Sequence, residues 1–336
     1  MSDPHPETRQ DPITQQWVIQ APSRSERPQR TGAPTPEHDP RDDTPVEGCP
    51  FCPGHEAMLP AIHAQRDADD RPWHTRAVPN KYPALTPDAP DAQTAAPFYR
   101  SRPNTGHQEV LIDTPYHHQD LAQMSVDEVD AVLQTYLARY RAVREADSDR
   151  LPILFRNHGA RAGASIDHPH SQLIAPTFVP PMLRQEEAAA QTQYQEDGTC
   201  PYCTMIAVEQ DVESRMVWSD EHAVCFVPYA ARVPYELWIL PRRHEPEVAH
   251  TTDAERRSVA TALQTACHRL YTHLGDPDYN FFVRTAIAYQ SEAPYLHWSL
   301  RIRPRTTVEA GFERATGLHI NPSSPERDAA VLRNDG

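Results

Sequence analysis

The chain has 336 residues, with 32 Lys and Arg against 47 Asp and Glu, so its formal net charge is −15. Phosphate repels a protein of this charge, which excludes a main role in coating nucleic acid but leaves small phosphorylated ligands open. No run of about 18 apolar residues is present, and the first twenty residues contain no apolar signal core. We therefore expect a cytosolic chain of about two domains without a membrane span.

The six cysteines divide into two groups by their spacing. Four of them form two Cys-x2-Cys pairs, CPFC at 49–52 and CPYC at 200–203. In a cytosolic chain this spacing is more often metal-binding than disulfide-forming. The other two, Cys225 and Cys267, have no partner at ligand spacing, and we expect small core residues there.

The segments that follow the two cysteine pairs resemble each other, and a repeat of this kind organises a whole chain. The matched landmarks are, in order, Glu109 with Glu236, His117 with His244, Arg156 with Arg284, and His168 with His297. The histidines are 51 residues apart in the first half and 53 in the second. Matched residues at matched distances indicate a tandem duplication.

Each repeat predicts one long helix and several short strands. Apolar residues at a spacing of three to four predict amphipathic helices at 125–147 and 252–274. The runs that follow, 151–159 and 279–287, are rich in strand-forming residues. We therefore predict an α+β fold in which each half is an antiparallel sheet crossed by a helix. The polar segment 185–199 marks the boundary, giving predicted domains 1–190 and 191–336.

Cysteine and histidine side chains of each half form a candidate metal set. Zn²⁺ prefers four such ligands in tetrahedral geometry, and a set without an open position is structural. The first set is Cys49, Cys52, His117 and His168, and the second is Cys200, Cys203, His244 and His297. His118 is a rival ligand, but the register of the repeat selects His117. The alternative is a knuckle turn beside unrelated core histidines.

The segment IDHPHSQLIAP at 166–176 places His168, His170 and Gln172 on alternate positions. In an extended strand such residues share one face, and Pro169 disfavours a helix at His168. With His168 on a metal, His170 is a free imidazole that can attack phosphorus, and Gln172 can donate to a phosphate oxygen. The second half has Ser299 at the position of His170, which suggests that one half is active and the other is kept for structure or binding.

Weaker signals for phosphate binding surround this segment. Arg24 and Arg27 lie in SRSERPQR, and arginine suits bidentate phosphate binding, although arginine in a polar loop is usually only solvated. Gly163 and Ser165 precede the histidine pair, where backbone N–H groups and a hydroxyl can cradle phosphate.

Motifs over nearly the whole length resemble the galactose-1-phosphate uridylyltransferase family of the histidine-triad superfamily. They are RQDPITQQWVIQAPSRSERP (9–28), CPFCPGHE (49–56), VPNKYPAL (78–85), TGHQEVLIDTPYHHQDL (105–121), FRNHGARAGASIDHPHSQ (155–172) and AGFERATGLHINPSSPE (310–326). The resemblance implies two histidine-triad-like halves, a structural zinc site and a homodimer, with a nucleotide sugar and a sugar 1-phosphate as partners. It implies double displacement, in which His170 takes UMP from UDP-glucose and passes it to galactose 1-phosphate.

The resemblance also assigns binding residues. Those that match positions near the nucleotide and its phosphates are Arg24, Arg27, Asn80, Asn157, Gly163 and Ser165, and those that match the sugar-contacting tail are Glu313 and Asn321. Gln172 matches the residue that holds the phosphoryl oxygen. We expect no nucleic-acid partner.

Two departures from the family pattern leave the substrates open. The best-known family members carry a further metal site of one Glu and three His, and Glu186 matches its Glu, but Arg301 and Arg303 replace two of its histidines. The second Cys/His set and the sequence HPHSQ are similar to a divergent branch that includes ADP-glucose phosphorylases. The alternatives are therefore adenylyl transfer with phosphate as acceptor, or a non-catalytic metal-stabilised nucleotide-binding protein.

Overall fold

The computed structural model describes residues 6–26, 39–88, 98–148, 150–287 and 290–333. Ten strands form one sheet that runs through both halves of the chain. The strands of the first half are β3 (Ala64–Arg66), β4 (Thr75–Pro79), β5 (Gly106–Ile112), β6 (Ile153–His158) and β7 (His170–Pro176). Those of the second half are β8 (Met216–Ser219), β9 (Ala223–Phe226), β10 (Leu237–Pro241), β11 (Tyr279–Arg284) and β12 (Ser299–Pro304).

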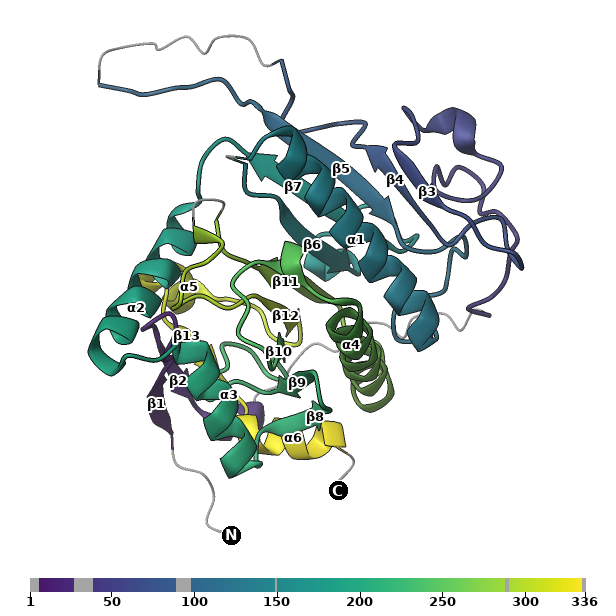
Figure 1. Cartoon of the computed structure of the whole chain (residues 1–336). Helices are drawn as coiled ribbons and strands as arrows, with labels where there is room; N and C mark the ends of the chain where they lie inside the picture. The colour runs from purple at the N-terminus through teal and green to yellow at the C-terminus, as the bar shows by residue number, and fades with distance from the viewer. Residues whose placement is uncertain (1–5, 27–38, 89–97, 149, 288–289, 334–336) are drawn as a thin grey trace.

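The strand order of the first half recurs in the second half, read in the opposite direction across the sheet. It is β3-β4-β5-β7-β6-β11-β12-β10-β9-β8, with every neighbouring pair antiparallel. Each half contributes five strands in equivalent order, and the halves join edge to edge where β6 pairs with β11 (Figure 1). The predicted α+β duplication is therefore confirmed in its topology.

One long helix crosses each half-sheet, close to its predicted bounds. α1 spans Val126–Ala146 and α4 spans Asp253–Leu274. Each begins with a capping box, in which Ser125 or Thr252 accepts from the third helical N–H and Glu128 or Glu255 accepts from the cap N–H. The two helices lie side by side on the same face of the sheet (Figure 1) and share its largest apolar core.

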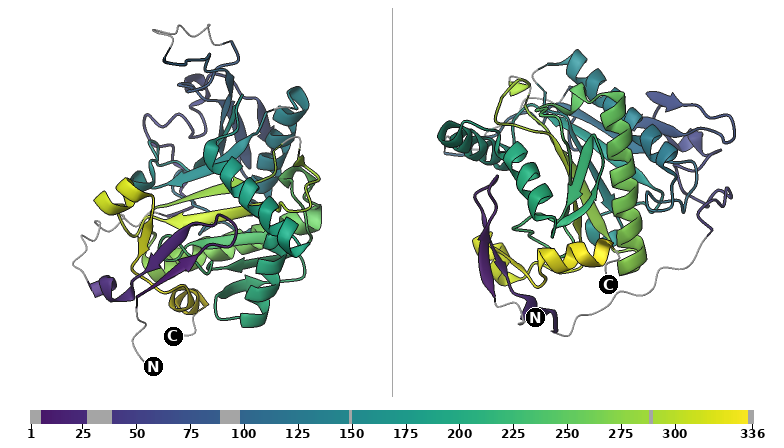
Figure 2. Two further views of the ribbon diagram at one scale, coloured as in Figure 1. Left: turned by 90° about the vertical axis from the view of Figure 1, so that its left-hand side faces the viewer. Right: turned by 60° about the horizontal axis from the view of Figure 1, so that its bottom comes forward.

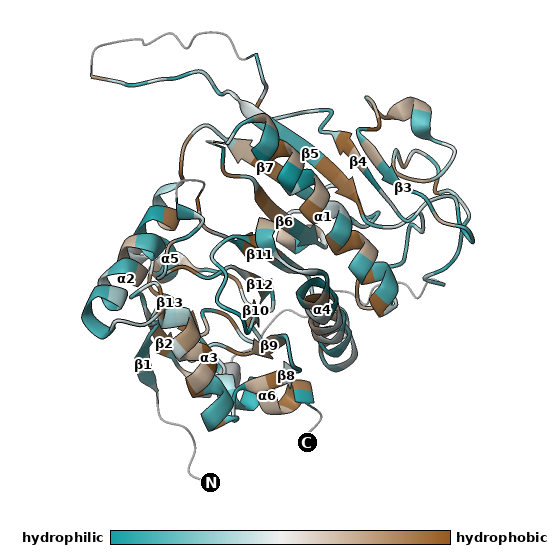
Figure 3. Ribbon diagram, in the orientation of Figure 1, coloured by the Kyte–Doolittle hydropathy of each residue, from teal (hydrophilic) through white to brown (hydrophobic). Residues whose placement is uncertain are grey.

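Strand alternation sends the polar residues of interest to the opposite face. In β7, Leu173 and Ala175 belong to the core under α1, whereas Gln172 contacts Gln108 of β5 on the far face. In β12, Leu300 and Ile302 likewise face the helices. Figure 3 shows apolar residues concentrated on the central strands and polar ones along α2 (Pro181–Asp197).

The first and last strands of the chain pack together on the second half. β1 (Glu7–Gln10) and β2 (Trp17–Gln20) form a hairpin, and β13 (His319–Asn321) adds to β2 in parallel. In Figure 2 the purple hairpin lies against the yellow tail. The remaining helices are η1 (Pro22–Glu26), η2 (Glu56–Met58), η3 (Ala160–Ala162), α3 (Pro201–Val212), η4 (Val248–His250), α5 (Gly311–Thr316) and α6 (Pro325–Arg333).

The predicted domain boundary falls inside α2, and the N-terminal hairpin lies with the second half in space, so the division at residue 190 stays a prediction. No helix in the described part of the chain is long and apolar enough to cross a membrane.

The predicted match of Arg156 with Arg284 is wrong by one residue. Arg156 is opposite Ser171 in the β6–β7 pairing, whereas Arg284 is opposite Ser299, the counterpart of His170. A shift of one residue sends a side chain to the other face, so Arg284 corresponds to Asn157. Arg156 accordingly lies under α1 and pairs with Asp113 and Asp120, while Arg284 lies on the far face.

Candidate active site and Cys/His clusters

The four predicted ligands of the first half converge at one end of β7. Cys52 Sγ is 3.4 Å from His117 Nδ1 and 3.6 Å from His168 Nδ1, and Cys49 Sγ is also 3.6 Å from His168 Nδ1. Zinc bonds of about 2.0–2.3 Å place tetrahedral ligand atoms about 3.3–3.8 Å apart. The spacing and the donor types therefore fit a metal, and the cluster includes His117 rather than His118.

The second half repeats this geometry. Cys200, Cys203, His244 and His297 bring their ligand atoms within 4.8 Å of one another. Cys203 Sγ is 3.4 Å from His244 Nδ1 and 3.7 Å from His297 Nδ1. The duplication therefore preserved two clusters of the same donor set.

Equivalent backbone carbonyls orient one histidine in each cluster. His168 Nε2 is 2.8 Å from the carbonyl of Thr114, and His297 Nε2 is 3.0 Å from that of Pro241. An Nε2–H that donates to a carbonyl leaves Nδ1 unprotonated and aimed at the sulfurs, as a metal ligand requires. Burial, the main cause, lowers the pKa of His168 to about 3, so its ring is neutral at pH 7.

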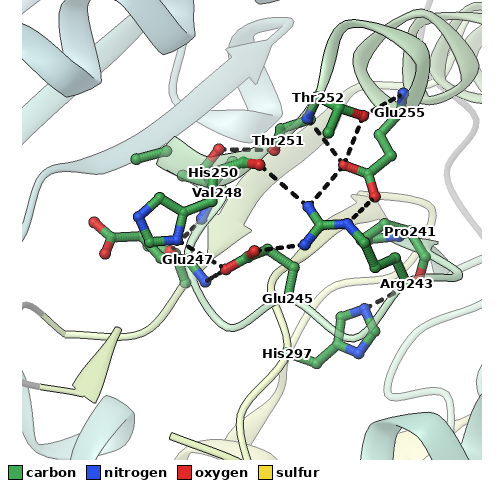
Figure 4. A network of polar contacts seen from close by, with 12 residues as sticks. Pro241, Arg243, Glu245, Glu247, Val248, His250, Thr251, Thr252, Glu255 and His297 are labelled. Atoms are coloured by element: carbon green, nitrogen blue, oxygen red, sulfur yellow. Dashed lines mark hydrogen bonds and ion pairs between the residues drawn. The ribbon is translucent and has the colours of Figure 1, made fainter. Parts of the chain in front are cut away.

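The loop that carries His244 is fixed to the start of α4. Arg243 Nε is 2.6 Å from Glu255 of the capping box, and its Nη1 is 2.8 Å from Glu245 (Figure 4). In the first half Arg71 pairs with Glu128, the capping-box residue of α1. In both halves the glutamate that caps the helix thus also holds an arginine.

His170 lies beside the first cluster with one ring nitrogen engaged. Its Nδ1 is 2.9 Å from the carbonyl of His168, and an Nδ1–H that donates there leaves Nε2 as an unprotonated nucleophile. Phe51, between the two cysteines of the pair, packs against it at 5.3 Å between ring centroids. Burial lowers the pKa of His170, which keeps the imidazole neutral.

Gln172 follows His170 on the same face of β7 and connects to the segment after β4. Its Oε1 accepts from Gln108 Nε2 at 3.3 Å, which directs the Gln172 amide nitrogen away from Gln108. The Gln108 backbone carbonyl in turn accepts from the N–H of Asn80 at 3.1 Å, and its side chain accepts from the N–H of Ala84. Asn80 itself closes a turn by accepting from the N–H of Tyr82.

The predicted phosphate loop lies between β6 and β7. Asn157, at the end of β6, accepts from Asn280 Nδ2 at 2.8 Å, and Asn280 also donates to the carbonyl of Ala162. Gly163 has φ +94°, a backbone conformation that favours glycine, and both it and Ser165 are exposed. The N–H groups of Gly163 and Ala164 already donate to the carbonyls of Ala160 and Gly159, so the group that the loop presents to solvent is the hydroxyl of Ser165.

The remaining predicted binding residues fall in different places. Arg24 and Glu313 line one cavity, which also contains Arg161 and Arg232. Asn321 is fully buried, with its amide donating to Ala231 and accepting from the N–H of Ser323, so the predicted sugar contact finds no support in this geometry. Arg27 lies outside the described residues.

In the second half, charged residues that form an ion pair occupy the region that corresponds to the candidate active site of the first half. Ser299 and Arg301 occupy the places of His170 and Gln172, and Arg284 that of Asn157. Glu186 of α2 lies 3.3 Å from Arg301 and 3.4 Å from Arg284. Arg303 pairs with Glu236 at 2.9 Å. The carboxylate of Glu186 therefore contacts both Arg301, the counterpart of the predicted catalytic Gln172, and Arg284, the counterpart of the predicted substrate-binding Asn157.

Sequence reasoning missed Phe51, Gln108, Arg161 and Arg232. The aromatic residue inside the cysteine pair was a usable signal for Phe51. The other three depend on which strands and loops become neighbours.

Comparison with known proteins agrees with this geometry. A family model described as "Galactose-1-phosphate uridyl transferase, N-terminal domain" matches residues 1–180. The chain belongs to the galactose-1-phosphate uridylyltransferase family. A second model, for a domain of unknown function, matches residues 111–333.

Two members of the family align with this chain almost from end to end. An ADP-glucose phosphorylase of Arabidopsis thaliana is 32% identical over 98% of this chain and 92% of its own length. A galactose-1-phosphate uridylyltransferase of Thermotoga maritima is 26% identical over 97% and 98%. The crystal structure of the Arabidopsis enzyme with bound ADP-glucose superimposes with a TM-score of 0.82, at 30% identity over 98% of this chain and 99% of that one. The chain is thus a nucleotidyltransferase of this family.

Proposed function

We propose that this chain transfers a nucleotidyl group from a nucleotide sugar to a phosphate-bearing acceptor through a covalent intermediate on His170. The observation that carries the proposal is the orientation of that ring. Its Nδ1 is held by the carbonyl of His168, which leaves Nε2 unprotonated, and strand alternation places its side chain on the face of the sheet that also carries Gln172.

In the first step His170 Nε2 attacks the α-phosphorus of the donor. A P–N bond forms, and the bond between the α-phosphorus and the bridging oxygen breaks, releasing a sugar 1-phosphate. In the second step a phosphate oxygen of the acceptor attacks the same phosphorus and the P–N bond breaks, which restores the neutral imidazole. Gln172 donates its amide N–H to a phosphoryl oxygen, and the exposed hydroxyl of Ser165, in the loop after Gly163, donates to another phosphate oxygen.

We propose zinc as the metal of both Cys/His clusters. A four-ligand zinc supplies structure rather than chemistry, because no coordination position stays open. The ligands would be Cys49, Cys52, His117 and His168 in the first half and Cys200, Cys203, His244 and His297 in the second. In the first half this fixes His168, whose carbonyl in turn orients His170.

Two substrate pairs fit this chemistry, and each has support. UDP-glucose with galactose 1-phosphate is supported by the family model and the Thermotoga relative. ADP-glucose with phosphate is supported by the Arabidopsis relative, whose structure contains ADP-glucose and whose sequence shares 32% of its residues with this chain. The cytosolic location and the homodimer stay predictions.

The test separates the covalent step from the substrate choice. The protein is incubated with UDP-glucose or ADP-glucose carrying label in the α-phosphate and no acceptor, and labelled protein is isolated. Label should attach to wild type and not to His170→Ala, and the donor that labels faster identifies the nucleotide. Chasing with galactose 1-phosphate or with phosphate identifies the acceptor. A metal-loaded protein that takes no label from either donor contradicts the proposal.

A further inference from the structure

Ser171 is a buried polar residue of β7 that no step of the proposed reaction uses. It directly follows His170, faces α1 on the helix side of the sheet and is only 1% exposed. Its Oγ donates to Asp113 Oδ2 at 3.2 Å and contacts the hydroxyl of Tyr136 on α1. Tyr136 in turn donates to the other carboxylate oxygen of Asp113 at 2.9 Å. The three side chains therefore form a closed triangle of hydrogen bonds next to the proposed nucleophile.

Asp113 holds the chain on both sides of His170. Its backbone N–H donates to the carbonyl of Pro169 at 3.1 Å, and its carboxylate accepts from Ser171. These two residues are the neighbours of His170 in the sequence. His170 is the last residue of β7 that pairs with β5, and it lies one residue beyond the last pair with β6. The sheet alone therefore holds His170 less firmly than the middle of the strand, and Asp113 supplies the additional bonds.

An arginine keeps the carboxylate of Asp113 in place. Arg156 Nη1 pairs with Asp113 Oδ2, and the side chains of both residues are 1% exposed. Burial raises the pKa of Asp113 to about 6, and the charge of Arg156 opposes this rise, so the carboxylate is mainly ionised at pH 7. An ionised acceptor forms stronger hydrogen bonds than a neutral one, which fixes the hydroxyls of Ser171 and Tyr136.

The second half has apolar residues at the positions of this polar group. The register of the paired strands and the distance from the helix caps match Ser171 with Leu300, Arg156 with Val283 and Tyr136 with Leu263. All three second-half residues are buried in the apolar core between the sheet and the long helices. The fold of one half is therefore built without any of these three polar side chains.

A buried ionic group is a poor means of stabilising a core. The cost of removing both charges from water can exceed their attraction, and apolar residues of similar volume are often equally or more stabilising. The half that retains the polar group is the half with His170, whereas the half with Ser299 at that position has the apolar core. The polar group therefore accompanies the nucleophile and is not required by the fold.

We propose that Ser171 and Asp113 are positioning residues for nucleotidyl transfer. They hold the backbone on either side of His170 from the helix side of the sheet, so that the imidazole meets the α-phosphorus in one orientation. Both side chains are buried on the face opposite His170, so they act through the strand and not on the substrate. Such a role affects the rate strongly, because a misplacement of about 1 Å can cost about a hundredfold. This inference rests on the proposed covalent step at His170.

The decisive variant is Ser171→Ala, which removes one hydroxyl and leaves the ion pair of Asp113 intact. Ser171→Thr restores a hydroxyl, and Tyr136→Phe removes the other hydroxyl of the triangle while it keeps the ring in the core. The matched control is Ser258→Ala in α4, far from His170 in the sequence and in the other half. Ser258 is 4% exposed and donates to Asp220 at 2.6 Å, so the control loses the same kind of hydrogen bond.

The measurement follows labelling of His170 in single turnovers of metal-loaded protein at several concentrations of the labelled donor. Ser171→Ala should lower the labelling rate at saturating donor at least about tenfold and change the half-saturating concentration less than about twofold, because the nucleophile and not the donor is displaced. Ser171→Thr should regain most of the rate, and Tyr136→Phe should slow labelling in the same way. Ser258→Ala should leave the rate and the half-saturating concentration unchanged, although its urea midpoint falls as that of Ser171→Ala does.

The outcomes separate this inference from the proposed function. Wild type that takes label while Ser171→Ala is labelled equally fast overturns the inference and leaves the covalent step intact. Equal slowing in Ser171→Ala and Ser258→Ala indicates a general loss of stability and also overturns it. Wild type that takes no label from either donor overturns the proposed function, and the inference with it. If Ser171→Ala does not fold, Tyr136→Phe decides: labelling at the wild-type rate overturns the inference, and slower labelling with an unchanged half-saturating concentration supports it.

Discussion

Gly159 is the position where a single methyl group should disturb both stability and nucleotide transfer. It links β6 to η3 with φ +80° and ψ 160°, a combination reserved for glycine. A Cβ at this residue would lie within 2.7 Å of three side-chain atoms of Asp278, in the second half. That carboxylate accepts from the N–H of Arg161 and so cannot move away without loss.

The cost of Gly159→Ala has two parts. The backbone conformation costs about 1–3 kcal/mol for a residue with a Cβ. Displacing Asp278 breaks its bond to the N–H of Arg161, which adds about 1 kcal/mol. We expect Gly159→Ala to lower the free energy of unfolding by about 2–4 kcal/mol and to slow labelling of His170, because the phosphate loop shifts with η3.

Urea unfolding, followed by fluorescence and by circular dichroism with coincident transitions, measures the stability change. The matched control is Gly198→Ala at the end of α2, where φ is +72° but nothing lies within 4 Å of the added Cβ. Gly198→Ala should lower the free energy of unfolding by only about 1–2 kcal/mol, the cost of a left-handed backbone conformation for alanine, and should not change the labelling of His170. In the double variant Gly159→Ala with Asp278→Ala, the steric part should disappear. Equal stability and equal labelling in the two single variants refute the reasoning.

Three further outcomes are expected. Elemental analysis should find two zinc ions per chain in wild type and one in Cys203→Ser. A wild-type protein without bound metal contradicts the proposal that the Cys/His clusters are zinc sites. Glu186→Gln leaves the buried Arg301 unpaired and should lower the free energy of urea unfolding by about 3–5 kcal/mol, so a loss below about 1 kcal/mol argues against the pair. Burial alone lowers the pKa of His158, but the carboxylates of Asp120 and Asp276 raise it to about 10. Because this folded-state pKa lies above the unfolded one, wild type should have a higher free energy of unfolding than His158→Gln, with the full difference below about pH 6.5 and none toward pH 10. A difference in free energy of unfolding that grows as the pH rises contradicts this prediction.

The repeat and the Cys/His spacing were readable from the sequence because they depend on local periodicity. The helices α1 and α4 fall within one residue of their predicted bounds at each end, where apolar spacing and helix caps agree. Alternation in 166–176 placed His170 and Gln172 on one face, as the structure has them.

What depends on register or on distant packing could not be read. The predicted match of Arg156 with Arg284 is wrong because a shift of one residue in a strand places the side chain on the opposite face of the sheet. Both positions carry arginine, so residue type alone could not reveal the shift. The ion pair between Glu186 and Arg301 requires α2 to cover the second half-sheet.

The pairing of β2 with β13 has a consequence for the order in which the molecule is assembled during synthesis. Ile19 is opposite Ile320, so 301 more residues must be translated after Ile19 before its partner exists, which takes about 15–60 s at common elongation rates. All four residues of the first Cys/His cluster are present once His168 has left the ribosome, so the metal proposed for it can bind early. The cavity around Arg232 needs the tail through Pro322 and forms only near chain release. A nascent chain therefore acquires its proposed nucleophile before it acquires the cavity lined by Arg24 and Glu313.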